Sequence, residues 1–178
     1  MGRYDKSEGN KKILLIAEAF GGGVYWDIVQ IANFLSDKFI VCIGYTQTLE
    51  LHDNYEKEFN KNVRLVKLCN NKKRGLIRYF NFLIGMRRLI KEFAPDVVHF
   101  HSSIAGVLGR WCFWFHPYKM YYSPHGFAYL NNDSKIKTFL YWLIEKISSV
   151  RKCTIIACGE KEYELACKFR KDSVCIVN

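Results

Sequence analysis

The sequence predicts an α/β fold, a doubly wound parallel sheet with helices on both faces, from two observations. First, short apolar runs typical of buried parallel strands alternate with helical patterns along the whole chain. Second, the run Ile13–Ala17 is followed at once by three glycines, Gly21–Gly23, and then by a helical pattern starting near Ile28. With 178 residues, 49% of them hydrophobic, the chain suits one domain with a real core. We expect residues 11–178 to form it, after a disordered tail at 1–10.

The remaining elements follow in order from the same patterns. Val63–Leu68 alternates as an edge strand does, Pro95 stops a helix, and Ser102 or Ser103, and later Asp133 or Ser134, are natural N-caps. The expected strands after the first are Phe39–Tyr45, Val63–Leu68, Asp96–His101, Tyr118–Ser123, Thr154–Cys158 and Val174–Val177. The expected helices after the first are a short piece before Asn60, then Leu76–Phe93, Ser102–Phe115, Ser134–Val150 and Gly159–Arg170.

Positive charge is concentrated in one segment. The formal net charge is +10, and the stretch from Lys61 to Lys91 holds ten basic residues and no acidic one. On a helical wheel, Ile77, Phe80 and Ile84 fall among these charges, which favours an anionic membrane surface as the partner. A solvated face with locally covered apolar residues is the alternative; nucleic acid is not expected, because no recognised binding module is present. The expected membrane-surface residues are Lys72, Lys73, Arg74, Arg78, Arg87, Arg88 and Lys91.

Cysteine usage indicates a reducing compartment, and hydropathy gives no sign of a membrane span. Seven cysteines are present without a CxxC pair, so neither a zinc site nor a redox motif is predicted. No apolar run reaches the roughly 18 residues of a membrane span, and no signal peptide precedes the first strand. We therefore expect a cytoplasmic protein, peripheral on the inner face of the membrane.

The glycine loop lies where doubly wound sheets bind ligands, at the carboxyl end of a strand. Glycine lets the backbone approach a ligand, and a helix N-terminus offers N–H groups to an anion. A nicotinamide cofactor is disfavoured because Trp26 replaces the third glycine of the dinucleotide fingerprint, and no Gly-Lys-Ser/Thr of a P-loop follows. A tight turn without a ligand is the alternative, but we expect Gly21, Gly22 and Gly23 to contact substrate.

Histidines mark two further strand ends. His99 and His101 point the same way from one strand, but no third ligand with suitable spacing makes a metal site. We expect His99 to be a hydrogen-bonded core residue. His101, followed by Ser102, is placed to line the ligand site, and His125 stands between Pro124 and Gly126 after the next strand. A locally satisfied loop histidine is the alternative for His125.

Together, GGGVYWDIVQIANFL, PDVVHFHSS, SPHG and IIACGEKEYELA resemble the N-terminal half of a family 4 glycosyltransferase, the large retaining group with the GT-B fold that includes bacterial capsule and polysaccharide transferases. The resemblance runs from about Lys12 to Asn178 and implies a Rossmann-like domain. By resemblance, Gly22 and Gly23 face the donor diphosphate and acceptor, and His125 contacts the transferred sugar. Glu160 matches half of a usual Ser-Glu pair. We expect Tyr25, Ser102 and Glu160 to bind substrate as well, and His125 to be the catalytic residue.

The resemblance also implies a reaction and its partners. A sugar moves from a nucleotide-sugar donor to a glycan acceptor, expected to be lipid-linked, with retention and without a metal or cofactor. By the resemblance we expect the 178 residues to lack the family's second, donor-binding domain, and Val174–Asn178 resembles the entry to the hinge. We therefore expect this chain alone to be inactive and to need that domain or a separate donor-binding subunit. The alternative is a non-catalytic membrane-docking subunit; the donor and acceptor identities, the oligomeric state, and whether the chain is a fragment are not predicted.

Overall fold

The computed structural model describes residues 11–48, 51–70, 75–113, 118–130 and 133–175. Seven strands form a parallel α/β sheet in the order β3-β2-β1-β4-β5-β6-β7, as the sequence predicts. The chain divides into two compact units, one up to Val98 and one from His99, and the boundary falls within β4. The strands are β1 Lys12–Phe20, β2 Ile40–Gln47, β3 Arg64–Cys69, β4 Val97–His101, β5 Lys119–Ser123, β6 Thr154–Ala157 and β7 Val174–Cys175. The helices are α1 Gly22–Ser36, α2 Leu76–Phe93, α3 Ser103–Cys112, α4 Lys135–Ser148 and α5 Glu160–Phe169, with 3-10 turns η2 Tyr55–Glu58 and η3 Ala128–Leu130.

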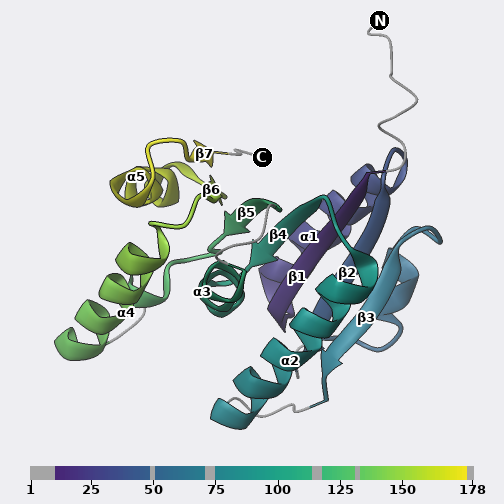
Figure 1. The fold of residues 1–178 in the computed structure, drawn as a ribbon, viewed down its shortest axis with the longest axis horizontal. Helices are drawn as coiled ribbons and strands as arrows, with labels where there is room; N and C mark the ends of the chain where they lie inside the picture. Colours follow the sequence, from purple (N-terminus) through teal and green to yellow (C-terminus); the bar gives the residue numbers. More distant parts are fainter. Residues whose placement is uncertain (1–10, 49–50, 71–74, 114–117, 131–132, 176–178) are drawn as a thin grey trace, which may run out of the picture. The chain divides into compact units, whose positions relative to one another are not determined.

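In the first unit, α1 and α2 cover opposite faces of β1–β3 (Figure 1). Successive side chains of a strand point to opposite faces, so both faces of the buried strand β1 need apolar residues. Ile13, Leu15 and Ala17 pack in the cluster that α1 completes. On the other face, the side chain of Leu89 from α2 lies so close to Gly44 of β2 that an added Cβ would be 2.8 Å from it. The pairing of β1 with β2 is parallel, with Leu15 opposite Ile43.

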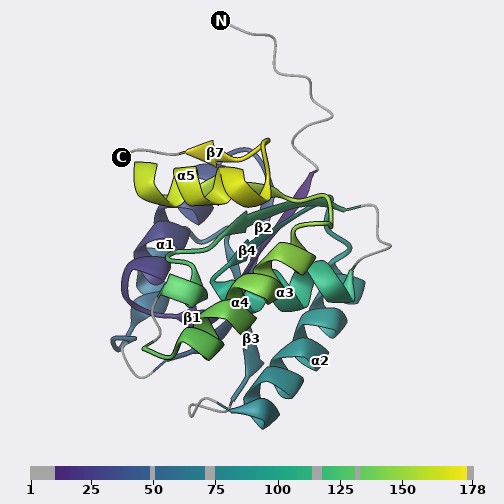
Figure 2. The ribbon, with the colours of Figure 1, turned by 90° about the vertical axis from the view of Figure 1, so that its left-hand side faces the viewer.

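In the second unit, α3 lies very close to strand side chains because it carries glycines. A Cβ on Gly106 would lie 2.3 Å from the Tyr122 ring, and one on Gly109 would lie 2.3 Å from Phe100. Helix α5 lies beside β6 and β7, and Figure 2 shows it next to β7. The register of β6 with β7 is parallel, with Ile156 opposite Val174.

A buried ion pair joins α3 to α4 within the second unit. The Arg110 Nη2 atom lies 2.8 Å from Glu145 Oε1, and the Arg110 Nε–H donates to the Gly106 carbonyl at 2.9 Å. The guanidinium also lies over the Tyr122 ring, 4.4 Å from its centroid. Burial, the largest single effect, lowers the pKa of Arg110. The charge of Glu145, the nearby Tyr122 and Cys153 and the hydrogen bond to Glu145 together outweigh burial, so the pKa is raised. Two charges that are unfavourable in a core are thus accommodated together.

The expected elements are all present where the structure describes them, and two of the expected residues occupy the N-cap positions. Helix α2 has the predicted bounds, β3 lies at the edge, and the other boundaries differ by a few residues. Ser102 and Ser134 occupy the N-cap positions of α3 and α4, but neither makes a side-chain capping hydrogen bond. The residues 176–178 of the last expected strand lie outside the described ranges.

Candidate functional site

The glycine loop begins α1 earlier than the periodicity predicts. The helix starts at Gly22, with Gly21 as its extended N-cap residue, and the Tyr25 N–H donates to the Gly21 carbonyl at 3.3 Å. Gly22 has φ of 55°, a left-handed conformation that favours glycine. Gly22 and Gly23 are exposed, and a Cβ on Gly23 would meet no atom within 4 Å. The helix N-terminus is therefore open to an approaching group.

Tyr25, which we expected to bind substrate, is a core residue. Its ring is buried edge-on against Phe20 at 5.2 Å between centroids, and its hydroxyl donates to the Tyr55 carbonyl at 3.0 Å. Burial, followed by the charge of Glu58, raises its pKa to about 12. The prediction was wrong because the partner Tyr55 lies 30 residues away, and nothing in the local pattern places the two together.

The second unit brings two of the predicted histidines together. The His101 Nδ1 atom, at the end of β4, lies 3.0 Å from His125 Nε2 in the loop after β5. His101 is fully buried, and that burial, followed by the nearby His125, holds its pKa well below the ordinary value. We expected His101 to line the ligand site, but its side chain is buried. It contacts the half-exposed His125 instead. His99 is a buried, hydrogen-bonded residue as predicted, with Nε2 2.9 Å from the Ser123 hydroxyl.

Backbone strain marks the same loops. His125 has φ of 52° and Ser102 has φ of 82°, conformations that a side chain disfavours. The Ser102 N–H donates to the Ser123 carbonyl at 3.0 Å, while its buried hydroxyl has no hydrogen-bond partner among the described residues. Such strain persists only where surrounding contacts hold it, and it is concentrated at functional sites.

Glu162, which the sequence analysis missed, fixes the loop that carries His125. Its Oε1 accepts the Gly126 N–H at 2.7 Å and its Oε2 accepts the Cys158 N–H at 2.8 Å. Glu162 stands three residues after the N-cap Gly159, the position from which a glutamate commonly reaches back over a helix start. That spacing could have predicted its contact at the start of α5, but not its bond to Gly126, which lies 36 residues earlier. Glu160 is exposed at the first position of α5, and its substrate role remains a prediction.

The expected membrane surface on α2 needs one correction. Arg78 is only 2% exposed: its Nε lies 2.7 Å from Glu18 Oε1, and its Nη2 donates to the Glu18 carbonyl at 2.7 Å. A helical wheel assumes that arginine is solvated, and it cannot show a buried carboxylate on β1. Arg87, Arg88 and Lys91 are exposed, whereas Lys72, Lys73 and Arg74 lie outside the described residues.

Large apolar side chains are exposed on the first half of the same helix. The exposed residues are Leu76, Ile77, Phe80 and Ile84. The exposure of Ile77, Phe80 and Ile84 agrees with the expectation that they do not face the core. No helix in the described ranges is both long and apolar enough to cross a membrane.

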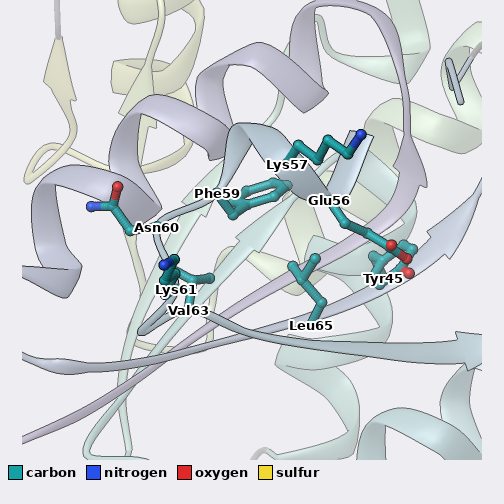
Figure 3. A pocket seen from close by; sticks show the side chains of 8 residues that line it. All are labelled: Tyr45, Glu56, Lys57, Phe59, Asn60, Lys61, Val63 and Leu65. Carbon is teal, nitrogen blue, oxygen red and sulfur yellow. The ribbon is translucent and has the colours of Figure 1, made fainter. Parts of the chain in front are cut away.

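A pocket of about 550 Å³ lies elsewhere in the first unit (Figure 3). It is lined from β2, η2 and β3 and their connections by Tyr45, Glu56, Lys57, Phe59, Asn60, Lys61, Val63 and Leu65. None of the residues predicted to bind substrate lines it. It lies beside the edge strand β3.

Comparison with known proteins agrees with the resemblance in the sequence. An uncharacterized 41.2 kDa protein in the cps region of Klebsiella pneumoniae is 29% identical over 160 residues, which cover 86% of this chain and 42% of that protein. Among solved structures, sucrose-phosphate synthase from Thermosynechococcus elongatus matches with a TM-score of 0.68, covering 93% of this chain and 47% of its own. Anabaena HepE in complex with UDP matches at 0.63, over 94% and 44% of the two chains, and Acinetobacter baumannii MurG at 0.56, over 86% and 42%. These three structures are each 12% identical and show a shared fold.

The chain thus spans less than half the length of the relatives it matches. A family model described as Glycosyltransferase Family 4 matches residues 21–177, which include the glycine loop, both histidine loops and the start of α5. The chain belongs to Glycosyltransferase Family 4.

Proposed function

We propose that this chain is the acceptor-side part of a retaining glycosyltransferase of polysaccharide biosynthesis. It would act with a donor-binding domain or subunit to move a sugar from a nucleotide-sugar to a lipid-linked glycan, without a resident cofactor. Family membership supports glycosyl transfer, and the relative from a cps region favours a capsule polysaccharide as the product. HepE was solved with UDP, which favours a uridine diphosphate sugar as a donor to test first.

The observation that carries the proposal is the fixed position of His125. Two contacts hold its strained backbone. The buried imidazole of His101 lies against its ring, and the carboxylate of Glu162 accepts the N–H of the next residue, Gly126. Such preorganised groups stabilise charge that develops in the transition state, because they need not reorient during the reaction. In a retaining transfer, positive charge builds at the anomeric carbon as the diphosphate leaves. His125 would donate a hydrogen bond to the sugar or the leaving group.

The glycine loop would have a separate role. The exposed Gly22 and Gly23 leave the N-terminus of α1 uncovered, so backbone N–H groups can meet a diphosphate or an acceptor hydroxyl. Gly23→Ala should leave the free energy of unfolding nearly unchanged, because its Cβ has open space. It should still lower transfer, because the methyl group would occupy the space that the ligand approaches.

The test begins with the length of the native polypeptide, measured by mass spectrometry on its source cells through peptides of this segment. The native polypeptide and the 178-residue chain are then assayed with labelled nucleotide sugars and extracted lipid-linked acceptors, with and without EDTA. We expect transfer by the native polypeptide in both conditions, with the anomeric configuration retained in the product by NMR. Rapid transfer by the 178-residue chain alone, or an inverted product, would refute this version of the proposal.

His125→Gln is the matched variant for the catalytic role. Removing one donor that stabilises developing charge costs roughly 10²–10³ in kcat. We expect a fall of about that size with an unchanged circular dichroism spectrum. A variant that keeps wild-type kcat would show that His125 is a structural loop residue.

A second candidate, favoured by the exposed apolar residues on α2, is docking to an anionic membrane, either beside catalysis or as a non-catalytic subunit. Phe80 is 63% exposed on α2 and Phe34 is 68% exposed on α1, so Phe34→Ser is a matched control for Phe80→Ser. Full burial of such a side chain is worth roughly 1.5–3 kcal/mol. Sedimentation with phosphatidylglycerol vesicles should therefore show at least about tenfold weaker binding for Phe80→Ser only. Equal binding by both variants would argue against docking through α2.

A further inference from the structure

Cys158 combines exposure with a basic neighbour. It lies directly after β6, and it is the exposed member of the seven cysteines; the others are buried or half-buried. Its Sγ atom lies 3.7 Å from Nδ1 of His125, within hydrogen-bond reach for sulfur. The opposite nitrogen of that imidazole faces His101 at 3.0 Å. The order thiol, imidazole, orienting group is the arrangement that activates a cysteine nucleophile.

The orienting group is suited to this role because it stays neutral. Burial and the adjacent His125 keep the pKa of His101 low, so its Nδ1 can accept a hydrogen bond at neutral pH. An imidazolium at His125 would then donate Nε2–H to His101 and Nδ1–H to the sulfur. The thiolate is the nucleophile of cysteine chemistry, and a neighbouring imidazolium stabilises it.

The charges around the sulfur act in both directions. The start of α5 contributes the positive end of a helix dipole, which favours a thiolate. Glu162 and Glu160 on the same helix oppose it. However, the two carboxylate oxygens of Glu162 each accept a backbone N–H, from Gly126 and from Cys158 itself, which partly offsets its charge.

We propose that Cys158 is a covalent modification site that forms a mixed disulfide with a small-molecule disulfide. In the reaction the Sγ proton passes to His125 Nδ1, and the thiolate attacks one sulfur of the small disulfide. A new S–S bond forms to Cys158 as the old one breaks, and the departing thiolate takes up the proton from His125 or from water. No net oxidant is required, because the disulfide itself is reduced.

The adduct would occupy the space beside His125. If His125 acts in sugar transfer as proposed above, thiolation would inhibit that transfer reversibly. The modification itself does not depend on the proposed function, because it is read from the mass of the protein.

The test uses the whole chain and dithiodipyridine, a disulfide that releases an absorbing thione, with the modified cysteine identified by peptide mass. An ordinary thiol is only about 3% ionised at neutral pH. We expect Cys158 to react at least about tenfold faster than Cys112, Cys167 and Cys175, and Cys158→Ser to remove the fast phase. His125→Gln should slow that phase about tenfold without accelerating modification at Cys153, whose pKa burial raises to about 12.

The pH dependence of the wild-type rate keeps the proposal testable if His125→Gln does not fold. An inflection below the ordinary thiol pKa of about 8.5 is expected. An inflection at or above that value, or a Cys158 rate equal to that of the half-buried cysteines, would overturn the proposal. Either result would leave the glycosyltransferase proposal standing, since neither measures sugar transfer.

Discussion

Replacing Glu145 with glutamine tests whether charge pairing stabilises the core of the second unit. The substitution keeps the size of the side chain and removes its charge, while the Arg110 guanidinium, 1% exposed, stays cationic. Breaking a buried pair by removing one partner costs about 3–5 kcal/mol. Arg110 keeps its bond to the Gly106 carbonyl and its contact with the Tyr122 ring, so we expect the lower end, about 3 kcal/mol. That is a large part of a typical total stability of about 5–15 kcal/mol.

The assay is urea unfolding, followed by circular dichroism and tryptophan fluorescence. The matched control is Glu92→Gln, because Glu92 pairs with Arg64 at 2.6 Å but both side chains are about half exposed. An exposed pair contributes about 0–1 kcal/mol, despite its shorter distance. If both variants lose the same stability, burial does not strengthen the pair and the reasoning fails. The double variant Arg110→Met with Glu145→Leu should recover most of the loss, since no charge is then buried.

Three further predictions concern the loops and α3. The unfolded chain protonates His101 below about pH 6.5, whereas the folded chain resists protonation. The free energy of unfolding should therefore decrease as the pH is lowered below that value, by up to about 1.4 kcal/mol per pH unit. His101→Asn should reduce that slope in urea unfolding between about pH 7 and pH 5, and identical slopes would contradict this reading. Glu162→Gln should cost about 1 kcal/mol and increase hydrogen exchange at the Gly126 amide, because an NH₂ group replaces one acceptor; unchanged exchange would exclude the clamp. Gly106→Ala should cost about 1–3 kcal/mol by overpacking, whereas Gly159→Ala, whose Cβ meets nothing within 4 Å, should cost much less in the same melts.

The sequence predicts the element order well because that order depends on local periodicity. The run Ile13–Ala17 is apolar on both faces, which only a strand covered on two sides requires, and Pro95 ends α2 by removing a backbone donor. The position of the glycine and histidine loops at strand ends follows from this order alone. Capping is less predictable: Ser102 occupies the N-cap position with φ of 82°, its N–H donates to the Ser123 carbonyl, and its side chain makes no capping bond.

The direction of polar side chains could not be predicted, because it depends on partners far away in the sequence. Tyr25 turns into the core to reach the carbonyl of Tyr55, and Arg78 turns in to reach Glu18, 60 residues earlier. We had expected Tyr25 to bind substrate and Arg78 to face a membrane, so both were predicted to lie at a surface. His125 was identified correctly as a loop residue, but the clamp by Glu162 becomes visible only when β5 and α5 are placed together.

The burial of Arg78 changes how α2 would meet a membrane. With that cation removed from the surface, the described first turns of the helix expose Leu76, Ile77 and Phe80, and the exposed arginines begin only at Arg87. Each basic residue near an anionic surface contributes about 1 kcal/mol to the binding free energy, and salt screens this contribution. An inserted apolar side chain contributes more, and salt does not screen it. Docking through α2 would therefore depend mainly on insertion of apolar side chains and only weakly on ionic strength. The internal pair with Glu18 supports this arrangement, because it anchors the start of the helix to the end of β1 while leaving the apolar side chains outward.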